Sequence, residues 1–492
     1  MLSRDQRRSN ASNSAWGWFA RLSLVVTCVA APVVLTTTLS AETLREAMAS
    51  AYQANPRLDA ERARLRATDE EVPRAKSGYR PTIEGTAEIG RSRTESTPQT
   101  TGAGSTNPKG YEVSIRQSVF NGFQTTNAVA EAEAGVRVGR ENLRFIENQT
   151  LLDAVTVYMD VVRDQQIVRI RESNVAVLSR ELEAAETRRA AREVTKTDVA
   201  QARARRARAV SAADLAKSNL KVSRAQFERV VRHPPSQLSE PPLKNKFLPR
   251  SLSEALGVAE QESPNVGSAL YREQAARHAV DRVWGELLPQ VQLEASYSRS
   301  EDASRSIEQS NSAQVTGRVT VPFYQGGEVH ARVRQAKHTH ISRMQEIEQA
   351  RSETQANVTA AWSRLMAARA QMRSDEVQVE AGRTALDGVR EEEKVGQRTL
   401  LDLLDAEQEY LDAQVAFAST RRDMVVAGYA LLSAMGRLSA EYLSLTSTVY
   451  DPESHYHESR QKWFGLSITH ADGRKELVDA ADEQNQPDDL AD

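Results

Sequence analysis

The chain has 492 residues, of which 5% are aromatic and 27% are charged, and its formal net charge is −3. So few aromatic rings exclude several compact globular cores, and only the stretch around residues 22–39 is apolar enough to resemble a membrane-spanning helix. A polytopic helical membrane protein is therefore excluded, and a mildly acidic chain is poorly suited to sequence-independent nucleic-acid binding.

Residues 1–41 have the pattern of a cleaved secretory signal peptide. Four arginines occur with one aspartate, the apolar run Leu22–Ala30 follows, and small residues close the segment at positions 39–41. A mitochondrial presequence is the alternative, but the run is too apolar for a one-faced amphipathic helix. The only cysteine, Cys28, lies in this segment and fits a lipidation box poorly, because Thr27 precedes it. Export of a chain that is otherwise free of thiols favours a bacterial envelope.

Two copies of one pattern follow the signal peptide. Residues 43–48 recur as 251–256, and residues 120–122 recur as 324–326. The expected organisation is repeat 1 at 42–232, a linker at 233–250, repeat 2 at 251–440 and a C-terminal extension at 441–492. The linker contains four closely spaced prolines, which cannot continue a helix. The extension ends in an acidic tail from Asp479 that is predicted to be disordered.

Each repeat contains two stretches in which apolar and polar residues alternate, as in strands with one apolar face. The strand pairs are expected at about 79–119 and 287–323, with polar loops at Ser92–Pro108 and Ser298–Ser312. The strand residues expected to face lipid are Tyr111, Val113, Ile115 and Val119 in repeat 1, and Val315, Val319, Val321 and Phe323 in repeat 2. Arg116 and Arg318, on the opposite face, are expected to face a pore.

Four strands are too few to close a barrel, yet a barrel in lipid leaves no edge unpaired. Closure must therefore come from other subunits, and three chains would supply twelve strands, an even number within the range of such barrels. The sequence thus predicts a homotrimer in contact with outer-membrane lipid. Two surface hairpins on a soluble helical protein are the alternative.

Long proline-free stretches rich in Ala, Glu, Arg and Gln follow the strand pairs, at Thr125–Arg192 and about Val329–Glu393. They predict helices of roughly 100 Å, at ~1.5 Å per residue. After Gly396, two adjacent rows of mostly apolar residues begin at Leu401 and Leu403 and advance by three and four positions. A helix with two such rows contacts a neighbour on each side, as in a closed ring of helices. An extended two-helix or four-helix coiled coil is the alternative.

The signal peptide, tandem repeat, strand pairs and double-rowed helices together resemble the TolC family of trimeric outer-membrane efflux and type I secretion channel proteins. The resemblance covers residues 42–440 and is most specific at Val395–Ala406, which is similar to the family's helix-tip turn, with Val395 and Gly396 at the turn itself. Residues 287–289 and 324–327 also resemble the family. The implied fold is mainly α with β, a trimer whose 12-stranded outer-membrane β-barrel is continuous with a periplasmic α-helical barrel.

The resemblance also implies a function, partners and a location. The chain is expected to be a passive export duct in the outer membrane of a Gram-negative bacterium, serving a tripartite efflux pump, a type I protein secretion system, or both. A periplasmic adaptor protein and an inner-membrane RND or ABC transporter would open it. The alternative is a periplasmic coiled-coil scaffold or adaptor without a pore, although an adaptor would carry a lipoyl-like domain or small β-barrel beside a single helical hairpin.

The tip of the second hairpin carries an acidic face. Outside the two apolar rows, the helix presents Asp402, Asp405, Glu409 and Asp412. Under threefold symmetry, Asp402 and Asp405 would form two rings of carboxylates that attract cations at the narrow end of the duct. A solvated outer face is the alternative interpretation.

The resemblance assigns roles to residues at both tips. It places the family's entrance carboxylates at Asp402 and Asp405, and its gate contacts at Arg398, Thr197 and Asp198. Arg398 is expected to pair with Asp198 or with another carboxylate of an adjacent hairpin.

Two residues depart from the family pattern. Arg192 stands where the first tip usually has a glycine, and Glu393 stands where some members carry an aromatic gate residue.

No enzyme activity and no cofactor is expected, because the chain has no Gly-rich phosphate loop, GxSxG elbow or HExxH motif. No metal site is expected either. His338 and His340 are two positions apart on a predicted helix and point in different directions. Glu453 and Glu458, beside the pair at 455 and 457, are interpreted as solvated charges.

Overall fold

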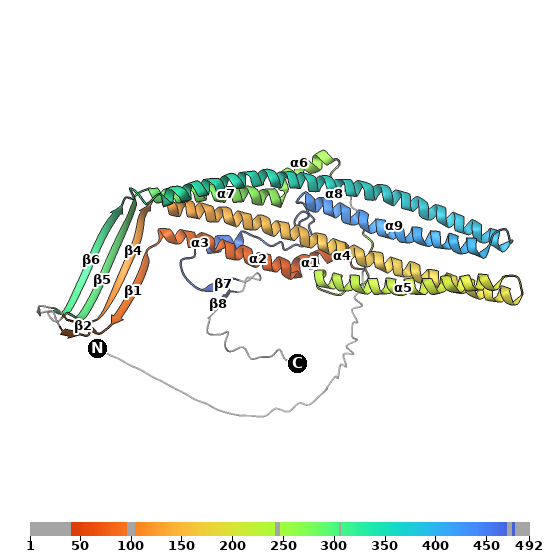
Figure 1. Cartoon of the computed structure of the whole chain (residues 1–492), viewed down its shortest axis with the longest axis horizontal. Coiled ribbons are helices and arrows are strands. Elements are labelled where there is room, and N and C mark those ends of the chain that lie inside the picture. The colour runs from red at the N-terminus through yellow and green to blue at the C-terminus, as the bar shows by residue number, and fades with distance from the viewer. Residues whose placement is uncertain (1–40, 96–103, 242–246, 305–306, 470–474, 478–492) are drawn as a thin grey trace, which may run out of the picture. The chain divides into compact units, whose positions relative to one another are not determined.

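The computed structural model describes residues 41–95, 104–241, 247–304, 307–469 and 475–477. The predicted signal peptide, with Cys28, and the predicted disordered tail from Asp479 lie outside the described residues, except for Ala41. Within the described part of the chain, no helix combines the length and the apolar composition needed to cross a membrane. Helices dominate, and the largest sheet has four strands (Figure 1).

Both repeats begin with short helices that lead into the sheet. Repeat 1 has α1 (Leu44–Ala54), α2 (Pro56–Asp69), α3 (Glu71–Lys76) and the 3-10 turn η1 (Ser77–Tyr79), and repeat 2 has α6 (Leu252–Glu262), α7 (Pro264–Trp284) and the 3-10 turn η3 (Gly285–Leu287). The side chains of Thr43 and Ser251 cap α1 and α6 by accepting a backbone N–H three positions on. Proline starts both α2 and α7, because it fits the first helical turn.

The four-stranded sheet has the order β1-β4-β5-β6, and all neighbours are antiparallel. Its strands are β1 (Thr82–Ile89), β4 (Lys109–Asn121), β5 (Gln290–Ser304) and β6 (Ile307–Thr320). One cross-strand row contains Ile83, Ile115, Ala295 and Val315, and the adjacent row contains Thr82, Arg116, Glu294 and Thr316. Adjacent rows lie on opposite faces of a sheet. The predicted alternation of an apolar and a polar face is therefore confirmed, and the β4–β5 pairing joins the two repeats.

The predicted polar loop at Ser298–Ser312 is wrong, because most of these residues belong to β5 and β6. The strands continue past the end of the apolar alternation, since their pairing is made by backbone hydrogen bonds and does not need apolar side chains. Within the predicted loop Ser92–Pro108, β2 (Ser92–Thr94) pairs with β3 (Gly104–Thr106) in a separate ribbon.

Val321 and Phe323 are not strand residues, contrary to the prediction. They follow the end of β6 at Thr320. Pro322 lies between them and has no N–H with which to continue the ladder.

Two glycines bring the end of β4 in repeat 1 against the helix-to-strand junction before β5 in repeat 2. Gly122, after β4, has a φ of +66°, and a Cβ added to it would lie 2.1 Å from the carbonyl oxygen of Gly285. A Cβ added to Gly285 would lie 2.2 Å from the carbonyl oxygen of Gly122. Neither position has room for a side chain, so only glycine permits this backbone contact.

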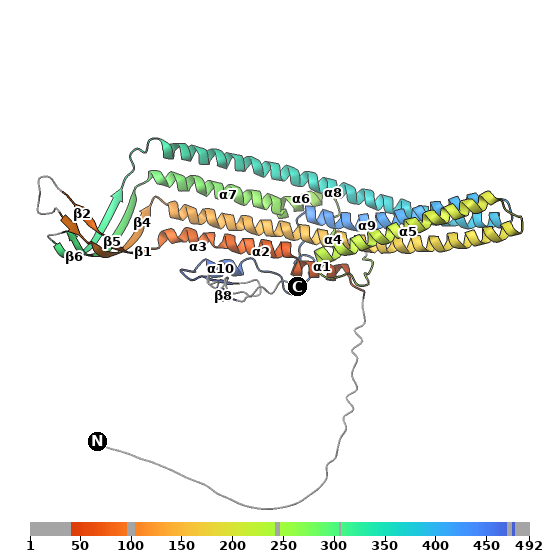
Figure 2. The same cartoon turned by 60° about the horizontal axis from the view of Figure 1, so that its bottom comes forward.

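Two long helical hairpins lead away from the sheet (Figures 1 and 2). They consist of α4 (Gln124–Ala190) and α5 (Lys196–Val231) in repeat 1, and α8 (Glu328–Lys394) and α9 (Leu400–Ala434) in repeat 2. The helices pack in the order α5–α4–α9–α8. At ~1.5 Å per residue, α4 and α8 are each roughly 100 Å long, which confirms the predicted long helices.

Helix α9 packs against two neighbours, α8 and α4, as predicted for a helix that carries two apolar rows. The buried members of the first row are Leu404, Leu411, Ala418, Val425 and Leu432, and those of the second row are Leu403, Ala413 and Leu431.

The main core lies where the short helices of both repeats meet the long ones. Tyr158 of α4 is fully buried there, and its hydroxyl lies 2.8 Å from the carbonyl oxygen of Glu42 and 2.6 Å from that of Ser239. Burial raises the pKa of Tyr158 to about 12, so the hydroxyl stays protonated. The N–H of Glu42 also donates to the carbonyl oxygen of Gln237 at 2.7 Å, and these contacts attach the proline-rich linker to the start of repeat 1.

The C-terminal extension packs onto α2 and α4 through α10 (Ser454–Ser459), beside which the short strands β7 (Ser467–Thr469) and β8 (Lys475–Leu477) pair (Figure 2). Glu453 pairs with Arg140 of α4 at 2.6 Å while its own side chain stays exposed, so the predicted solvated charge also takes part in an ion pair. His455 Nδ1 lies 3.0 Å from the buried Asp69 of α2. These residues meet because α10 packs against helices from a distant part of the sequence.

Candidate functional site

The second helical tip is closed by a Schellman turn. The N–H of Gly396 donates to the carbonyl oxygen of Glu393, and that of Gln397 donates to Glu392, both at 2.9 Å. These two hydrogen bonds satisfy carbonyls that the end of α8 would leave free.

The first tip has the same turn, although arginine replaces glycine. The N–H groups of Arg192 and Glu193 donate to the carbonyl oxygens of Arg189 and Arg188, again at 2.9 Å. Arg192 has a φ of +68°, close to the +77° of Gly396. The arginine therefore adopts the left-handed backbone that the turn requires, and both tips have one geometry.

Asp198 and Asp402 occupy the same structural position in the two repeats. Each is the third residue of its helix and accepts the N–H of the capping threonine, Thr195 or Thr399, at 2.8 Å and 2.9 Å. The threonine hydroxyl accepts the aspartate N–H in return, which completes a capping box. The backbone and hydroxyl hydrogen bonds from Thr399 lower the pKa of Asp402 and keep it charged.

Arg398 is held within its own tip. Its Nε lies 2.9 Å from Oε2 of Glu392. Among the described residues of this single chain, no contact joins Arg398 to Thr197 or Asp198, and Thr197 is exposed in the first turn of α5. The structure thus brings these three predicted gate residues to the helical tips without bringing them into contact.

Ion pairs connect the two hairpins near their tips. Arg188 of α4 pairs with Glu393 of α8, whose side chain is only 10% exposed. Arg205 of α5 pairs with Asp405 of α9. Glu393 therefore joins one hairpin to the other.

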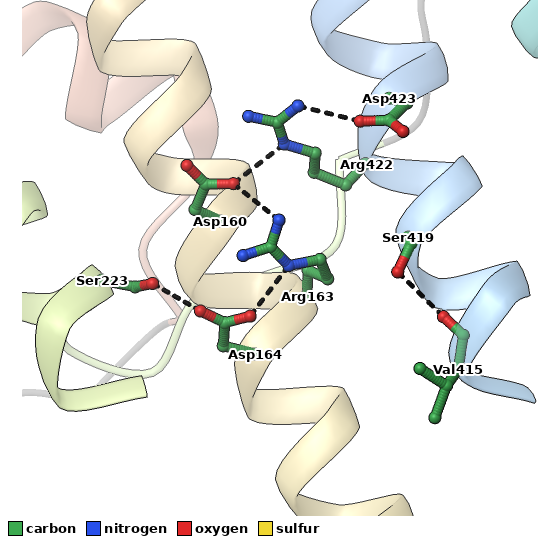
Figure 3. Close-up of polar contacts among 8 residues, drawn as sticks. All are labelled: Asp160, Arg163, Asp164, Ser223, Val415, Ser419, Arg422 and Asp423. Carbon is green, nitrogen blue, oxygen red and sulfur yellow. Dashed lines mark hydrogen bonds and ion pairs between the residues drawn. The ribbon is translucent and has the colours of Figure 1, made fainter. Parts of the chain in front are cut away.

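A larger network joins the hairpins farther from the tips (Figure 3). Asp160 of α4 lies between Arg422 of α9, at 2.9 Å, and Arg163, at 3.1 Å. Arg163 also pairs with Asp164 at 2.8 Å, and Asp164 accepts the hydroxyl of Ser223 from α5. Three helices are thereby connected through polar side chains, and separating the two hairpins requires breaking the contact between Asp160 and Arg422.

The acidic face of α9 is partly neutralised within the chain. Asp405, Glu409 and Asp412 are exposed. Asp405 is paired with Arg205, and Asp412 lies 4.0 Å from Arg171 of α4.

Sequence analysis missed Glu407, which is buried on α9. It pairs with Arg390 of α8 at 3.3 Å, and its Oε2 has no hydrogen-bond partner. Burial, followed by the negative charge of Glu181, raises the pKa of Glu407. Glu407 lies between the two apolar rows, three residues after Leu404, and this position was the sequence signal that could have indicated its burial.

The apolar face of the sheet is open. Tyr111, Val113, Ile115, Val315 and Val319 are all exposed in the single chain. Val119 is exposed too, but it lies at a β-bulge, and Phe120 takes the predicted place of Val119 in the row with Val291 and Val319. The structure adds residues that the prediction did not name, Ile83, Ile89, Leu293 and Tyr297. On the polar face, Arg116 lies 3.2 Å from both Glu84 and Glu294, and Arg318 lies in a row of the same face.

Comparison with known proteins identifies this architecture. The model of the outer membrane efflux protein family matches residues 47–231 and 255–437. The chain is 39% identical to the outer membrane efflux protein BepC of Brucella suis over 91% of this chain and 97% of the relative. It is 23% identical to the outer membrane protein TolC of Escherichia coli, over 84% of this chain and 86% of that protein. It is 24% identical to the alkaline protease secretion protein AprF of Pseudomonas aeruginosa, over 71% of this chain and 73% of that protein.

Solved structures show the same fold. The CmeC outer membrane channel of Campylobacter jejuni superposes with a TM-score of 0.74 at 15% identity, covering 85% of this chain and 89% of that one. The outer membrane protein VceC of Vibrio cholerae superposes with a TM-score of 0.69 at 18% identity, covering 80% and 96%.

The tandem strand pairs and long hairpins define a channel protein of the outer membrane, with its helical part in the periplasm. The chain belongs to the outer membrane efflux protein family, which confirms the TolC-family resemblance and the function in export. The alternative of a periplasmic scaffold without a pore is not supported.

Proposed function

We propose that three copies of this chain form the export duct, with a 12-stranded β-barrel in the outer membrane and a helical barrel in the periplasm. The main support for this proposal is the four-stranded sheet, which has an exposed apolar face and two unpaired edge strands, β1 and β6. Because four strands alternate in direction, β6 of one chain would meet β1 of the next in the antiparallel arrangement that outer-membrane barrels use. Heterologous contacts of this kind close into a ring under rotational symmetry.

The helical part supports the same assembly. Within the chain, α5 and α8 are the outer members of the four-helix layer. At similar distances from the tips, both carry exposed large apolar side chains, namely Leu215 and Val222 on α5 and Val377 on α8. Contact between α5 of one chain and α8 of the next would bury them, as expected for a closed ring of helices.

Disulfide crosslinking between the two edge strands tests this assembly. Thr86→Cys in β1 would be combined in turn with Ser310→Cys, Ser312→Cys and Gln314→Cys in β6, which lie on the same polar face. We expect covalent trimers on oxidation of whole cells at one of these registers. Thr86→Cys with Glu112→Cys is the control, because these residues are paired within one chain. Monomers and dimers alone at every register would contradict the trimer.

The partners follow from the position of the tips. The hairpins end roughly 100 Å from the sheet, where a periplasmic adaptor and an inner-membrane RND or ABC transporter would engage them. The relatives include an efflux protein and an alkaline protease secretion protein, which supports efflux, type I secretion, or both. Affinity purification of the full chain after crosslinking in cells would test this, and recovery of no inner-membrane transporter would contradict it.

The same proposal assigns the tip residues. Asp402 and Asp405 would form the acidic rings at the periplasmic entrance, and Arg398, Thr197 and Asp198 would hold neighbouring chains closed. The order of segments is proposed as 1–41 removed on export, two repeats at 42–232 and 251–440 joined by the linker 233–250, and the extension 441–492.

A further inference from the structure

The C-terminal extension is fixed to α2 and α4 at several points. His455 contacts Asp69 of α2, and Glu453 contacts Arg140 of α4. Arg460 Nη2 lies 2.9 Å from Glu133 of α4. Because Glu133 and Arg140 lie near the sheet end of α4, these contacts direct the extension toward the membrane.

The extension then reaches the point where the chain enters the sheet. The guanidinium of Arg80 lies 4.6 Å from the ring centroid of Trp463, and its Nη1 donates to the carbonyl oxygen of Lys462 at 3.1 Å. Arg80 is two residues before Thr82, the first residue of β1. Trp463 is therefore level with the boundary between helices and membrane strands.

Beyond Lys462, the extension exposes large apolar side chains. Trp463 is 67% exposed, Phe464 91%, Leu466 75% and Ile468 47%. Four such residues within six positions form a patch of the kind that marks an interaction surface.

Other aromatic residues are exposed at the same boundary. Tyr79 precedes β1, Phe123 follows β4, Trp284 precedes β5 and Phe323 follows β6. Outer-membrane barrels carry aromatic girdles where their strands leave the hydrocarbon, since amphipathic rings favour the membrane–water interface. The patch at 463–468 continues this girdle outside the strands.

We propose that Trp463, Phe464, Leu466 and Ile468 insert into the periplasmic leaflet of the outer membrane and anchor the C-terminal extension there. The occupant is a phospholipid surface, because the patch adjoins strands that already lie in lipid. The anchor goes beyond the export function, since it attaches α2 and α4 to the membrane through α10.

Spin labels on the full-length trimer test this anchor. Phe464→Cys, Leu466→Cys and Gln461→Cys would each be made in a Cys28→Ser background, which contains no other cysteine. The labelled protein would be placed in nanodiscs of phosphatidylethanolamine and phosphatidylglycerol, which leave both membrane faces open to solvent. Collision rates with oxygen, which concentrates in lipid, and with a water-soluble nickel chelate would then be measured by electron paramagnetic resonance.

We expect the oxygen-to-nickel ratio at 464 and 466 to exceed that at the exposed control position 461 several-fold. Equal ratios at all three positions would show a solvated patch and overturn the anchor. Low collision rates with both reagents at 464 and 466 would show burial against a neighbouring subunit and would also overturn it. Arg80→Ala provides a second test. Loss of the contact between Arg80 and Trp463 should lower the oxygen-to-nickel ratio at position 464.

Discussion

Arg192 and Gly396 occupy equivalent positions at the two helical tips and share a left-handed backbone, with φ angles of +68° and +77°. Glycine adopts this conformation without strain, whereas a residue with a Cβ is disfavoured by roughly 1 kcal/mol. The first tip therefore has the same geometry as the second, but the left-handed conformation of Arg192 lowers its stability.

Arg192→Gly should therefore stabilise the first tip by up to about 1 kcal/mol, and Gly396→Ala should destabilise the second by about the same amount. Hydrogen exchange of amides in the last turns of α4 and α8 would measure both effects. Ala191→Gly is the matched control, because Ala191 has a right-handed φ of −75° and should lose stability as glycine. Faster exchange in Arg192→Gly would contradict the assignment.

Glu407→Gln should stabilise the protein at neutral pH by on the order of 1 kcal/mol, because the pKa of Glu407 is raised by burial. A carboxyl whose pKa is higher in the folded chain favours folding when protonated. The charged carboxylate of Glu407 destabilises the folded chain. The free energy of unfolding therefore falls as the pH rises from about 4.5, the ordinary pKa of a glutamate, through the higher pKa that Glu407 has in the folded chain. The difference between variant and wild type should thus disappear at acidic pH.

Thermal unfolding of the detergent-solubilised protein at several pH values would follow that change. Glu409→Gln, on an exposed position of the same helix, is the control and should leave the midpoint unchanged. A lower midpoint for Glu407→Gln at neutral pH would show that the pair with Arg390 outweighs the cost of burial.

Val315→Arg should impair assembly far more than Thr316→Arg. Val315 lies inside the sheet in a row with Ile83 and Ile115, on the face proposed to contact lipid, and arginine near the bilayer centre costs about 2–4 kcal/mol. Val319 lies at the end of β6, where the expected cost falls to about 0–1 kcal/mol. Yields of heat-modifiable trimer in outer-membrane fractions would rank the variants, and equal yields for Val315→Arg and Thr316→Arg would show that the faces are wrongly assigned.

Arg398→Ser should raise the resting conductance of the channel in planar bilayers, because it removes a proposed contact between neighbouring tips. Thr197→Ala should act in the same direction. Lys394→Ser is the control, since Lys394 pairs with Glu391 of its own helix. A resting conductance equal to wild type in Arg398→Ser would remove Arg398 from the gate.

Asp405→Asn should weaken block by multivalent cations several-fold in the same recordings, because it removes three carboxylates from one proposed ring. Replacing Asp402 by alanine would also remove a capping box worth about 1 kcal/mol, whereas replacing Asp405 leaves the capping box intact and removes the ion pair with Arg205 of α5. Glu376→Gln, on an exposed position of α8 away from the tip, is the control. Undiminished block in Asp405→Asn would reject the ring.

The sequence by itself determined the features that depend on neighbouring residues. Alternation over 111–119 specified a strand with an apolar face, and the turn at Val395–Gly396 specified a helical tip. These signals are local, because a capping threonine or a left-handed glycine acts within one helical turn. The acidic face of the helix and the family resemblance pointed to Asp402 and Asp405, and the resemblance alone named Arg398, whose contact with Glu392 of its own tip was not predicted.

Only the tertiary structure decided which side chains meet across the fold. The pairs Arg188–Glu393 and Arg205–Asp405 join residues about 200 positions apart. The burial of Glu407 and the docking of His455 on Asp69 likewise depend on which helix covers which face. A charged residue in a long helix looks solvated in the sequence, and only the packing of a second helix against it determines whether it becomes an ion pair or a buried charge.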